Sequence, residues 1–195
     1  MNRLDEQLIE DYFKGDEASF ELLVQNYLKP IYSFVYRYVD NVHDADDITQ
    51  DVFVKVWRNL KKPVLSLSKG FNPKKGSFKT WIFAIAKNTA IDHLKKKKTI
   101  PFSEFENDKG ENMITETLVD PSPLPNELLE RVSVAQMLTS AMKKLSPKYE
   151  IILSLRYNNH FIFREIAESL GEPLHTIKSR HRRALIMLKK LLTDS

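Results

Sequence analysis

The chain has 195 residues, 42% of them hydrophobic, and its 30 Lys and Arg outnumber 26 Asp and Glu to give a formal net charge of +4. This length suits one or two small domains. The absence of cysteine excludes disulfides, thiolate zinc sites and a thiol nucleophile. The longest apolar run, residues 81–86, is too short to cross a bilayer. The acidic N-terminus lacks the pattern of an export signal, so we expect a cytoplasmic protein.

The charges alternate in blocks along the chain. Residues 1–60 hold 6 Lys and Arg against 12 Asp and Glu, and residues 61–100 hold 11 against 1. Residues 101–127 hold 1 against 7, and residues 128–195 hold 12 against 6. Two basic blocks separated by an acidic one indicate two contacts with nucleic acid, each strengthened by the release of counterions.

In the first block, apolar residues recur every three or four positions from Phe20 to Tyr38, across Pro30, and this predicts core-forming helix. A second helix is predicted from Asp44 to Leu60, with apolar residues on one side and acidic residues on the other. The early acidic residues suit the positive end of the helix dipole. Alternation of apolar and polar residues is nowhere sustained, so we expect an all-α fold.

Residues 61–77 are rich in Pro and Gly and are predicted to form a loop. Ser77 is suited to cap a third helix over residues 78–96, which runs into four consecutive lysines at 95–98. The following residues 101–127 are dominated by Pro and by acidic and amide side chains. This composition is typical of a flexible linker.

Four more helices are predicted, over residues 128–145, 148–157, 164–170 and 176–192. The last two are separated only by a tight turn at Gly171, and Thr176 stands where an N-cap is expected. The final helix has an apolar side and a strongly basic side, so the pair predicts a helix-turn-helix that places cations in a DNA groove. A solvated amphipathic helix is the plainer interpretation of the basic face.

The sequence therefore predicts two small helical domains, residues 1–100 and residues 128–195, joined by a flexible linker over residues 101–127.

Four stretches of this sequence resemble one known family. They are DADDITQDVFVKVW from Asp44, KKGSFKTWIFAIAKNTAIDHL from Lys74, LSPKYEIILSLRY from Leu145 and EIAESLGEPLHTIKSRHRRAL from Glu165. In this order they resemble bacterial sigma factors of the extracytoplasmic-function type, the two-domain group of the sigma-70 family. The resemblance covers nearly the whole chain. It implies a subunit that binds core RNA polymerase, recognises the minus-10 and minus-35 promoter elements and assists strand opening, without catalysis, cofactor, metal, small-molecule substrate or membrane insertion.

The resemblance also implies protein partners. The polymerase contacts are the clamp helices of the largest subunit and the flap, and an anti-sigma factor that clamps both domains is a further expected partner. The acidic helix would bind the clamp helices, and the motif match assigns that contact to Asp47, Gln50, Asp51 and Trp57. An acidic and amide face beside aromatic and apolar surface suits a protein interface better than a DNA interface. The alternative is a face that is merely solvated.

In the family, the part that matches residues 72–77 and the next helix reads the minus-10 element as single-stranded DNA. One base of that strand is extruded into a pocket. Lysines suit phosphates, Gly76 permits close approach of the backbone, and Phe78 and Asn88 offer an apolar wall and an amide edge. The residues assigned to minus-10 DNA are Lys74, Lys75, Gly76, Ser77, Phe78, Asn88, Lys95 and Lys96, the last two as part of a run that tracks phosphates. Trp81 shares helical spacing with the apolar residue at 85 and is expected in the core.

The family's minus-35 contacts come from the second helix of the helix-turn-helix, in the major groove. By motif match these are Lys178, Ser179, Arg182 and Arg183, with Thr176 and Arg180 as phosphate or turn contacts. The family threads its linker through the polymerase channel that later carries RNA, although the composition of residues 101–127 fits an ordinary tether equally well.

Three features depart from the family's pattern. Residues Pro63 to Gly70 (PVLSLSKG) look like an eight-residue insertion, which is thermodynamically cheap but adjoins a DNA-reading element. His160 and Ile162 stand where the family commonly has a glycine and then a Ser or Thr cap, and His175 stands where glycine usually precedes the recognition helix. A side chain at these turns either restricts the backbone or adds a DNA contact.

Two other functions fit parts of the sequence. A DNA-binding regulator that acts without polymerase would share the helix-turn-helix but would leave Asp47, Gln50, Asp51 and the second basic block unexplained. Asp44, Asp47 and Asp51 have a spacing that could bind a divalent ion, as in a nuclease. No paired His or Glu completes such a site in the sequence.

Overall fold

The computed structural model of the chain describes residues 3–60, 71–73, 75–99 and 126–193. The helices are α1 (Arg3–Phe13), α2 (Glu17–Val39), α3 (Val42–Leu60), α4 (Phe78–Thr99), α5 (Asn126–Lys143), α6 (Pro147–Leu153), the π-helical turn η1 (Ser154–Asn158), α7 (Phe163–Leu170) and α8 (Leu174–Thr193). No strand occurs in these residues, so the all-α prediction is confirmed for the described part of the chain. The predicted insertion at 63–70 lies outside the described residues, as does nearly all of the predicted linker.

Local capping explains where the N-terminal helices begin and end. Asp16 caps α2 by accepting a hydrogen bond from the Ala18 backbone N–H at 3.2 Å. The helix then continues through Pro30 as predicted and ends at Asp40, whose φ of 47° is left-handed. Ser77 caps α4, because its hydroxyl accepts from the Thr80 backbone N–H at 3.2 Å. The N-cap predicted at Ser77 is therefore confirmed.

The predicted helix-turn-helix is confirmed as α7 and α8. Gly171 ends α7 with a φ of 58°, a conformation that glycine adopts at little cost. The N-cap predicted at Thr176 is wrong, because α8 already begins at Leu174 and the Thr176 N–H donates to the Pro173 carbonyl at 3.0 Å. Proline lacks a backbone N–H and has a fixed φ, so it starts a helix without losing a bond, and here it moves the start ahead of Thr176.

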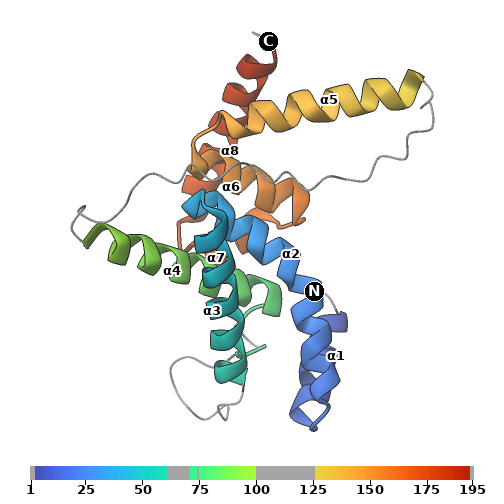
Figure 1. Cartoon of the computed structure of the whole chain (residues 1–195), viewed down its shortest axis with the longest axis vertical. Coiled ribbons are helices and arrows are strands. Elements are labelled where there is room, and N and C mark those ends of the chain that lie inside the picture. The colour runs from blue at the N-terminus through green and yellow to red at the C-terminus, as the bar shows by residue number, and fades with distance from the viewer. Residues whose placement is uncertain (1–2, 61–70, 74, 100–125, 194–195) are drawn as a thin grey trace.

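Helix α1 is attached to α2 through a buried polar pair. The Tyr27 hydroxyl donates a hydrogen bond to the Asp5 carboxylate, and both side chains are buried. Burial raises the pKa of Asp5, although the hydrogen bond from Tyr27 opposes the shift. This pair holds α1 antiparallel to the first half of α2, and the turn between the two helices lies at the lower end of the molecule (Figure 1).

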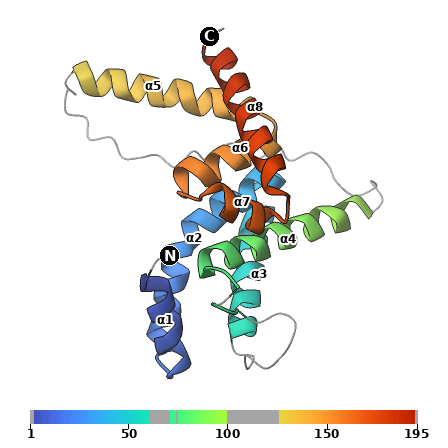
Figure 2. The same ribbon diagram turned by 180° about the vertical axis from the view of Figure 1, so that it is seen from behind.

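One hydrophobic core joins the N-terminal and C-terminal helices. Phe83 of α4 contacts Phe34 of α2 and Phe161, which follows η1, with both pairs of ring centroids 5.0 Å apart. Ile166 and Ile177 of the helix-turn-helix are fully buried in the same cluster. The two helical units predicted from the sequence thus pack directly on each other, with α6 and α7 against α2 and α4 (Figures 1 and 2).

Helix α5 lies apart from this core. It contacts α8 and extends away from the rest of the molecule (Figure 2). Its residues from Val132 to Ser140 are all exposed. Among the helices that the structure describes, none is long and apolar enough to cross a membrane.

The two histidines noted at turns differ in conformation. His160 has a φ of 56°, whereas His175 lies in the first turn of α8. A left-handed non-glycine residue costs about 1–2 kcal/mol, and the extra flexibility of glycine when unfolded costs about 0.5–1 kcal/mol. We predict that His160→Gly increases the free energy of unfolding by about 0.5 kcal/mol in urea denaturation. His175→Gly, the matched control, should decrease it, and the opposite order would contradict the assigned turn geometry.

Candidate protein and nucleic-acid interfaces

Helix α3 presents an acidic face to solvent. Its buried side is made of Ala45, Ile48, Thr49, Val52, Val56 and Leu60. Asp47, Gln50 and Asp51 are exposed on the other side, as the sequence predicted. Val54 lies between them and the end of the helix, with 42% of its surface exposed. The sequence analysis missed Val54, although an apolar residue outside the core stripe of an amphipathic helix was a signal that could have identified it.

Trp57 extends this face toward α1. Its side chain is 39% exposed and forms a hydrogen bond with Tyr12. The Tyr12 ring lies 5.3 Å from Phe20 and 6.2 Å from Phe13, which is 52% exposed. An aromatic patch of Tyr12, Phe13, Phe20 and Trp57 therefore continues the acidic face. The contact joins the ends of α1 and α3, so no local sequence pattern indicated it.

Asp44 does not belong to the exposed acidic face. Its carboxylate lies 2.8 Å from the Lys97 ammonium and 3.4 Å from His93 Nε2, both on α4. It therefore ties the start of α3 to the basic end of α4. Among the described residues, no group of three acidic or histidine side chains is arranged to hold a metal ion. The spacing of Asp44, Asp47 and Asp51 thus does not produce a shared site.

The residues predicted for minus-10 DNA do not all reach the surface. Lys75, Asn88, Lys95 and Lys96 are exposed, and Gly76 and Ser77 are half-buried. Lys74 lies outside the described residues. The seven described members therefore lie in three places: in the loop before α4 and at its first residue, in the middle of α4, and at its basic end.

The expectation that Phe78 offers an open wall to a base is not met in this arrangement. Its side chain is 2% exposed and packs edge-on against Tyr27 at 5.4 Å and Phe71 at 5.7 Å. Phe78 and Asn88 are ten residues apart, about 15 Å along the helix, so they do not face one pocket. Trp81 is partly buried beside Phe71 and Phe78, in agreement with its expected place in the core.

The N-terminal half of α8 carries the predicted basic face. Lys178, Ser179, Arg182 and Arg183 are exposed, while Ile177 and Ala184 turn inward and are fully buried. Arg180 is partly covered because its guanidinium forms an ion pair with Glu172 at 2.8 Å. Thr176 is half-buried. The four exposed residues therefore form one surface, whereas Arg180 stabilises the turn before α8.

Two further surfaces are apolar. Val134, Met137 and Leu138 of α5 are 43–57% exposed, and Ile186 and Met187 of α8 are 60% and 42% exposed. Because α5 and α8 contact each other, these side chains belong to neighbouring helices. Apolar exposure on this scale at adjacent helices is typical of a protein interface. The sequence analysis did not assign these residues to any site.

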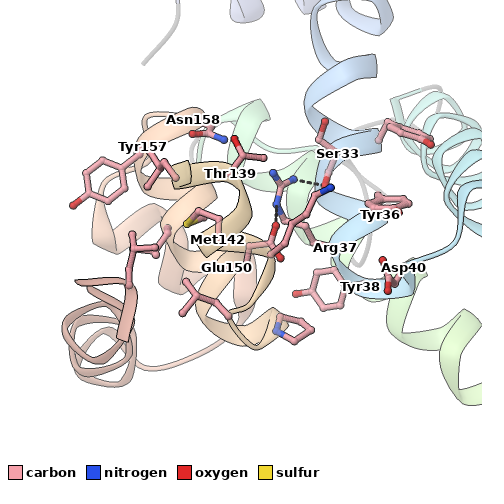
Figure 3. A pocket seen from close by; sticks show the side chains of 17 residues that line it. Ser33, Tyr36, Arg37, Tyr38, Asp40, Thr139, Met142, Glu150, Tyr157 and Asn158 are labelled. Atoms are coloured by element: carbon pink, nitrogen blue, oxygen red, sulfur yellow. Dashed lines mark hydrogen bonds and ion pairs between the residues drawn. The ribbon is translucent and has the colours of Figure 1, made fainter. Parts of the chain in front are cut away.

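A cavity of about 840 Å³ lies between α2 and the C-terminal helices. Figure 3 shows Arg37 extending from α2 to Glu150 of α6, with the Arg37 Nε to Glu150 Oε1 distance at 3.0 Å. Burial raises the pKa of Glu150, and the Arg37 charge opposes that shift. Tyr36 and Met142 line opposite walls of the same cavity.

His181 holds the recognition helix α8 against α7 and η1. Its ring lies edge-on to Phe163 at 5.0 Å, and its Nε2 is 3.2 Å from the Tyr157 hydroxyl. Burial, and then the nearby charge of Arg156, lower the pKa of His181. The sequence analysis missed this residue because its role depends on side chains that precede it by eighteen or more positions.

Two separate parts of the chain match models of one family. Residues 23–100 match the family model for Sigma-70 region 2, and residues 135–188 match the model for Sigma-70, region 4. The chain is 31% identical over 196 aligned positions to the ECF RNA polymerase sigma factor SigW of Bacillus subtilis, with 100% of both chains covered.

Solved structures show a similar fold. A structure of CnrH in complex with the cytosolic domain of CnrY matches 98% of this chain and 99% of that chain, with a TM-score of 0.61 and 22% identity. The sigma factor RpoE of Bartonella quintana, in complex with the anti-sigma factor NepR, matches 89% of this chain and 96% of that chain, with a TM-score of 0.61 and 20% identity. At these identities the likeness concerns the fold.

The lowered pKa of His181 predicts a pH dependence. As the pH falls below the ordinary histidine value of 6.5, the unfolded chain binds the proton before the folded chain does, so protonation favours unfolding. His181→Gln should therefore reduce the loss of stability between pH 7 and pH 5, measured as the shift in urea midpoint. An equal loss in the variant and the parent would contradict the burial assigned to His181.

Proposed function

We infer the roles of individual surfaces from one premise: this chain belongs to the extracytoplasmic-function group of the sigma-70 family. It is a transcription initiation factor that binds core RNA polymerase and directs promoter-specific initiation through minus-10 and minus-35 recognition. We propose that it does so in the cytoplasm and without catalysing a reaction. We also propose that residues 1–100 carry the polymerase and minus-10 functions, 128–195 the minus-35 function, and 101–127 the connection.

The acidic face of α3 is the proposed site for the clamp helices of the largest polymerase subunit. The observation that supports it is the exposure of Asp47, Gln50 and Asp51 on one side of a helix whose other side is buried. Val54 and Trp57 add apolar surface beside the charges, which is the composition of a protein interface with a polar rim. Acidic side chains repel phosphates, so this face is poorly suited to DNA.

The exposed face of α8 is the proposed minus-35 reader. Arg182 and Arg183 suit the acceptor edges of guanine, and Lys178 and Ser179 suit several partners in the major groove. Thr176 and Arg180, the other two residues expected at minus-35 DNA, support the turn before α8. The loop before α4, the middle of α4 and its basic end are the proposed minus-10 contacts, with Lys75 and Asn88 toward the single strand and Lys95 and Lys96 on duplex phosphates.

Two further protein contacts are proposed. The exposed apolar side chains of α5 and α8 are the proposed site for the polymerase flap, because α5 contacts α8 and the exposed Ile186 and Met187 follow the basic residues of α8 along the helix. An anti-sigma factor is the proposed regulator, since factors of this group are commonly held inactive by one. A regulator that binds DNA without polymerase would have no use for the acidic face of α3.

The acidic face is tested by charge reversal. Asp51→Lys should weaken the binding of core polymerase by about tenfold, equivalent to about 1.4 kcal/mol, because it places a cation in an interface that selects negative charge. Glu21→Lys is the matched control, since Glu21 is an exposed acidic residue on α2, outside the proposed face. Binding is measured by anisotropy of a labelled chain titrated with purified core enzyme, and equal effects of the two changes would contradict the assignment.

The minus-35 surface is tested on promoter DNA. Arg182→Ala should weaken minus-35-dependent binding by about tenfold and leave the affinity for core polymerase unchanged, because a base contact is worth about 1–3 kcal/mol. Lys190→Ala, an exposed cation of α8 outside the proposed set, should change both by less than twofold. Loss of polymerase binding in Arg182→Ala would contradict the proposed division of surfaces.

A further inference from the structure

Helix α8 begins about one turn earlier than the sequence predicted, and this places His175 inside it. The helix starts at Leu174, and the Thr176 backbone N–H already donates to the Pro173 carbonyl at 3.0 Å. His175 is not among the described residues with a positive φ, so its side chain does not strain the turn. It is an additional side chain at the end of the helix that enters the major groove.

The His175 side chain lies on the outer side of α8. Nine positions separate it from Ala184, which corresponds to about two and a half turns of an α-helix, so the two residues are on opposite sides. Ala184 is fully buried in a cluster with Leu153 of α6, and Ile177 is fully buried as well. His175 is exposed. It therefore faces away from the packing contacts that hold α8.

His175 also stands in the middle of the exposed basic face. Viewed down the helix axis, Arg182 and Lys178 lie about 20° and 60° to one side of it. Ser179 and Arg183 lie about 40° and 80° to the other side. All four are exposed. The face proposed to read minus-35 DNA is therefore centred on the line through His175, although the sequence did not assign this residue to the set.

The position of His175 along the helix axis extends that face. The rise of 1.5 Å per residue places it about 4.5 Å before Lys178 and about 10.5 Å before Arg182. One base-pair step of DNA is about 3.4 Å. The N-terminal residues of a recognition helix are those that contact base edges. His175 would therefore face the base pair next to those faced by the other four residues.

Negative charge near His175 is already neutralised. Glu172 is the only acidic residue between positions 171 and 193 of the sequence. Its Oε1 accepts from Arg180 Nη1 at 2.9 Å, and its Oε2 lies 2.8 Å from Arg180 Nη2. A bidentate pair of this kind is among the strongest that side chains form. The Glu172 carboxylate is thus held by a cation of its own helix turn and opposes DNA less than a free carboxylate would.

The imidazole ring of His175 suits one base better than the others. It carries an N–H donor in either protonation state. In the major groove, guanine presents two acceptors, N7 and O6, whereas adenine presents one acceptor beside a donor and cytosine presents a donor. A donor that approaches along the outer face of α8 therefore favours guanine.

We propose that His175 is a further specificity-determining residue, which donates a hydrogen bond to a guanine in the major groove at one edge of the minus-35 element. This inference rests on the proposed minus-35 role of α8. The contact adds one base pair to the sequence that Lys178, Ser179, Arg182 and Arg183 are proposed to read. It does not depend on a general attraction to phosphates.

The first test selects promoter sequences with the complete holoenzyme. The template is a promoter that the parent holoenzyme transcribes, with its minus-35 region randomised. We expect His175→Ala to reduce the guanine preference at one edge position from about tenfold to less than twofold, and to keep the other preferences. Alanine favours helix, so α8 is retained. Lys190→Ala, an exposed change near the other end of α8, should enrich the same sequences as the parent.

The second test changes the preferred base. Glutamine forms a bidentate pair with adenine, so His175→Gln should shift the preference at the same position from guanine to adenine by about tenfold. Affinities are measured by anisotropy of labelled promoter duplexes that differ only in this base pair. A loss that is equal for all four base pairs, with the slope of log affinity against log salt reduced by about 1, would indicate a phosphate contact and overturn base recognition.

The remaining outcomes separate this inference from the proposed function. If the parent holoenzyme enriches a minus-35 sequence and His175→Ala keeps every preference, the role of His175 alone is rejected. Loss of all preferences together in His175→Ala would show a displaced helix and would also overturn the single-base assignment. A parent holoenzyme that binds core polymerase but enriches no minus-35 sequence rejects the proposed function of α8 itself.

Discussion

The packing of Phe161 against Phe83 is the contact on which the arrangement of this molecule depends. It inserts a fully buried ring from the segment before α7 into the core formed by α2 and α4. Because α8 packs on α6 and α7, this single insertion also sets the position of the basic face of α8 relative to α4. The position of one proposed DNA surface relative to the other therefore depends on this aromatic contact.

The exposed surfaces of the molecule differ in the sign of their charge. The acidic face of α3 points away from its own buried stripe, while cations gather at the end of α4 and on the first half of α8. Asp44 marks the boundary, because it faces α4 and neutralises part of the basic run through Lys97. The proposed polymerase surface and the two proposed DNA surfaces therefore carry opposite charges.

The sequence predicted the helices well because their signals are local. The apolar spacing of α2 and α3, the Ser77 cap and the left-handed Gly171 all depend on neighbours within a few positions. The Thr176 N-cap failed for a local reason, the nearby Pro173, and the other errors arose where distant residues decide. Phe78 is buried by Tyr27 and Phe71, the Tyr12 contact extends the surface at Trp57 from another helix, and Lys79 is covered by a carbonyl 80 positions away. No periodicity within α4 distinguishes a covered lysine from an exposed one.

As a member of the sigma-70 family, this chain is expected to direct core RNA polymerase to specific promoters. Run-off transcription with purified core enzyme and genomic DNA fragments measures it most directly. The account predicts that adding the chain produces discrete transcripts whose start points share one pair of upstream minus-35 and minus-10 sequences, and that both sequences are required. Transcripts identical to those of core enzyme alone would contradict the account.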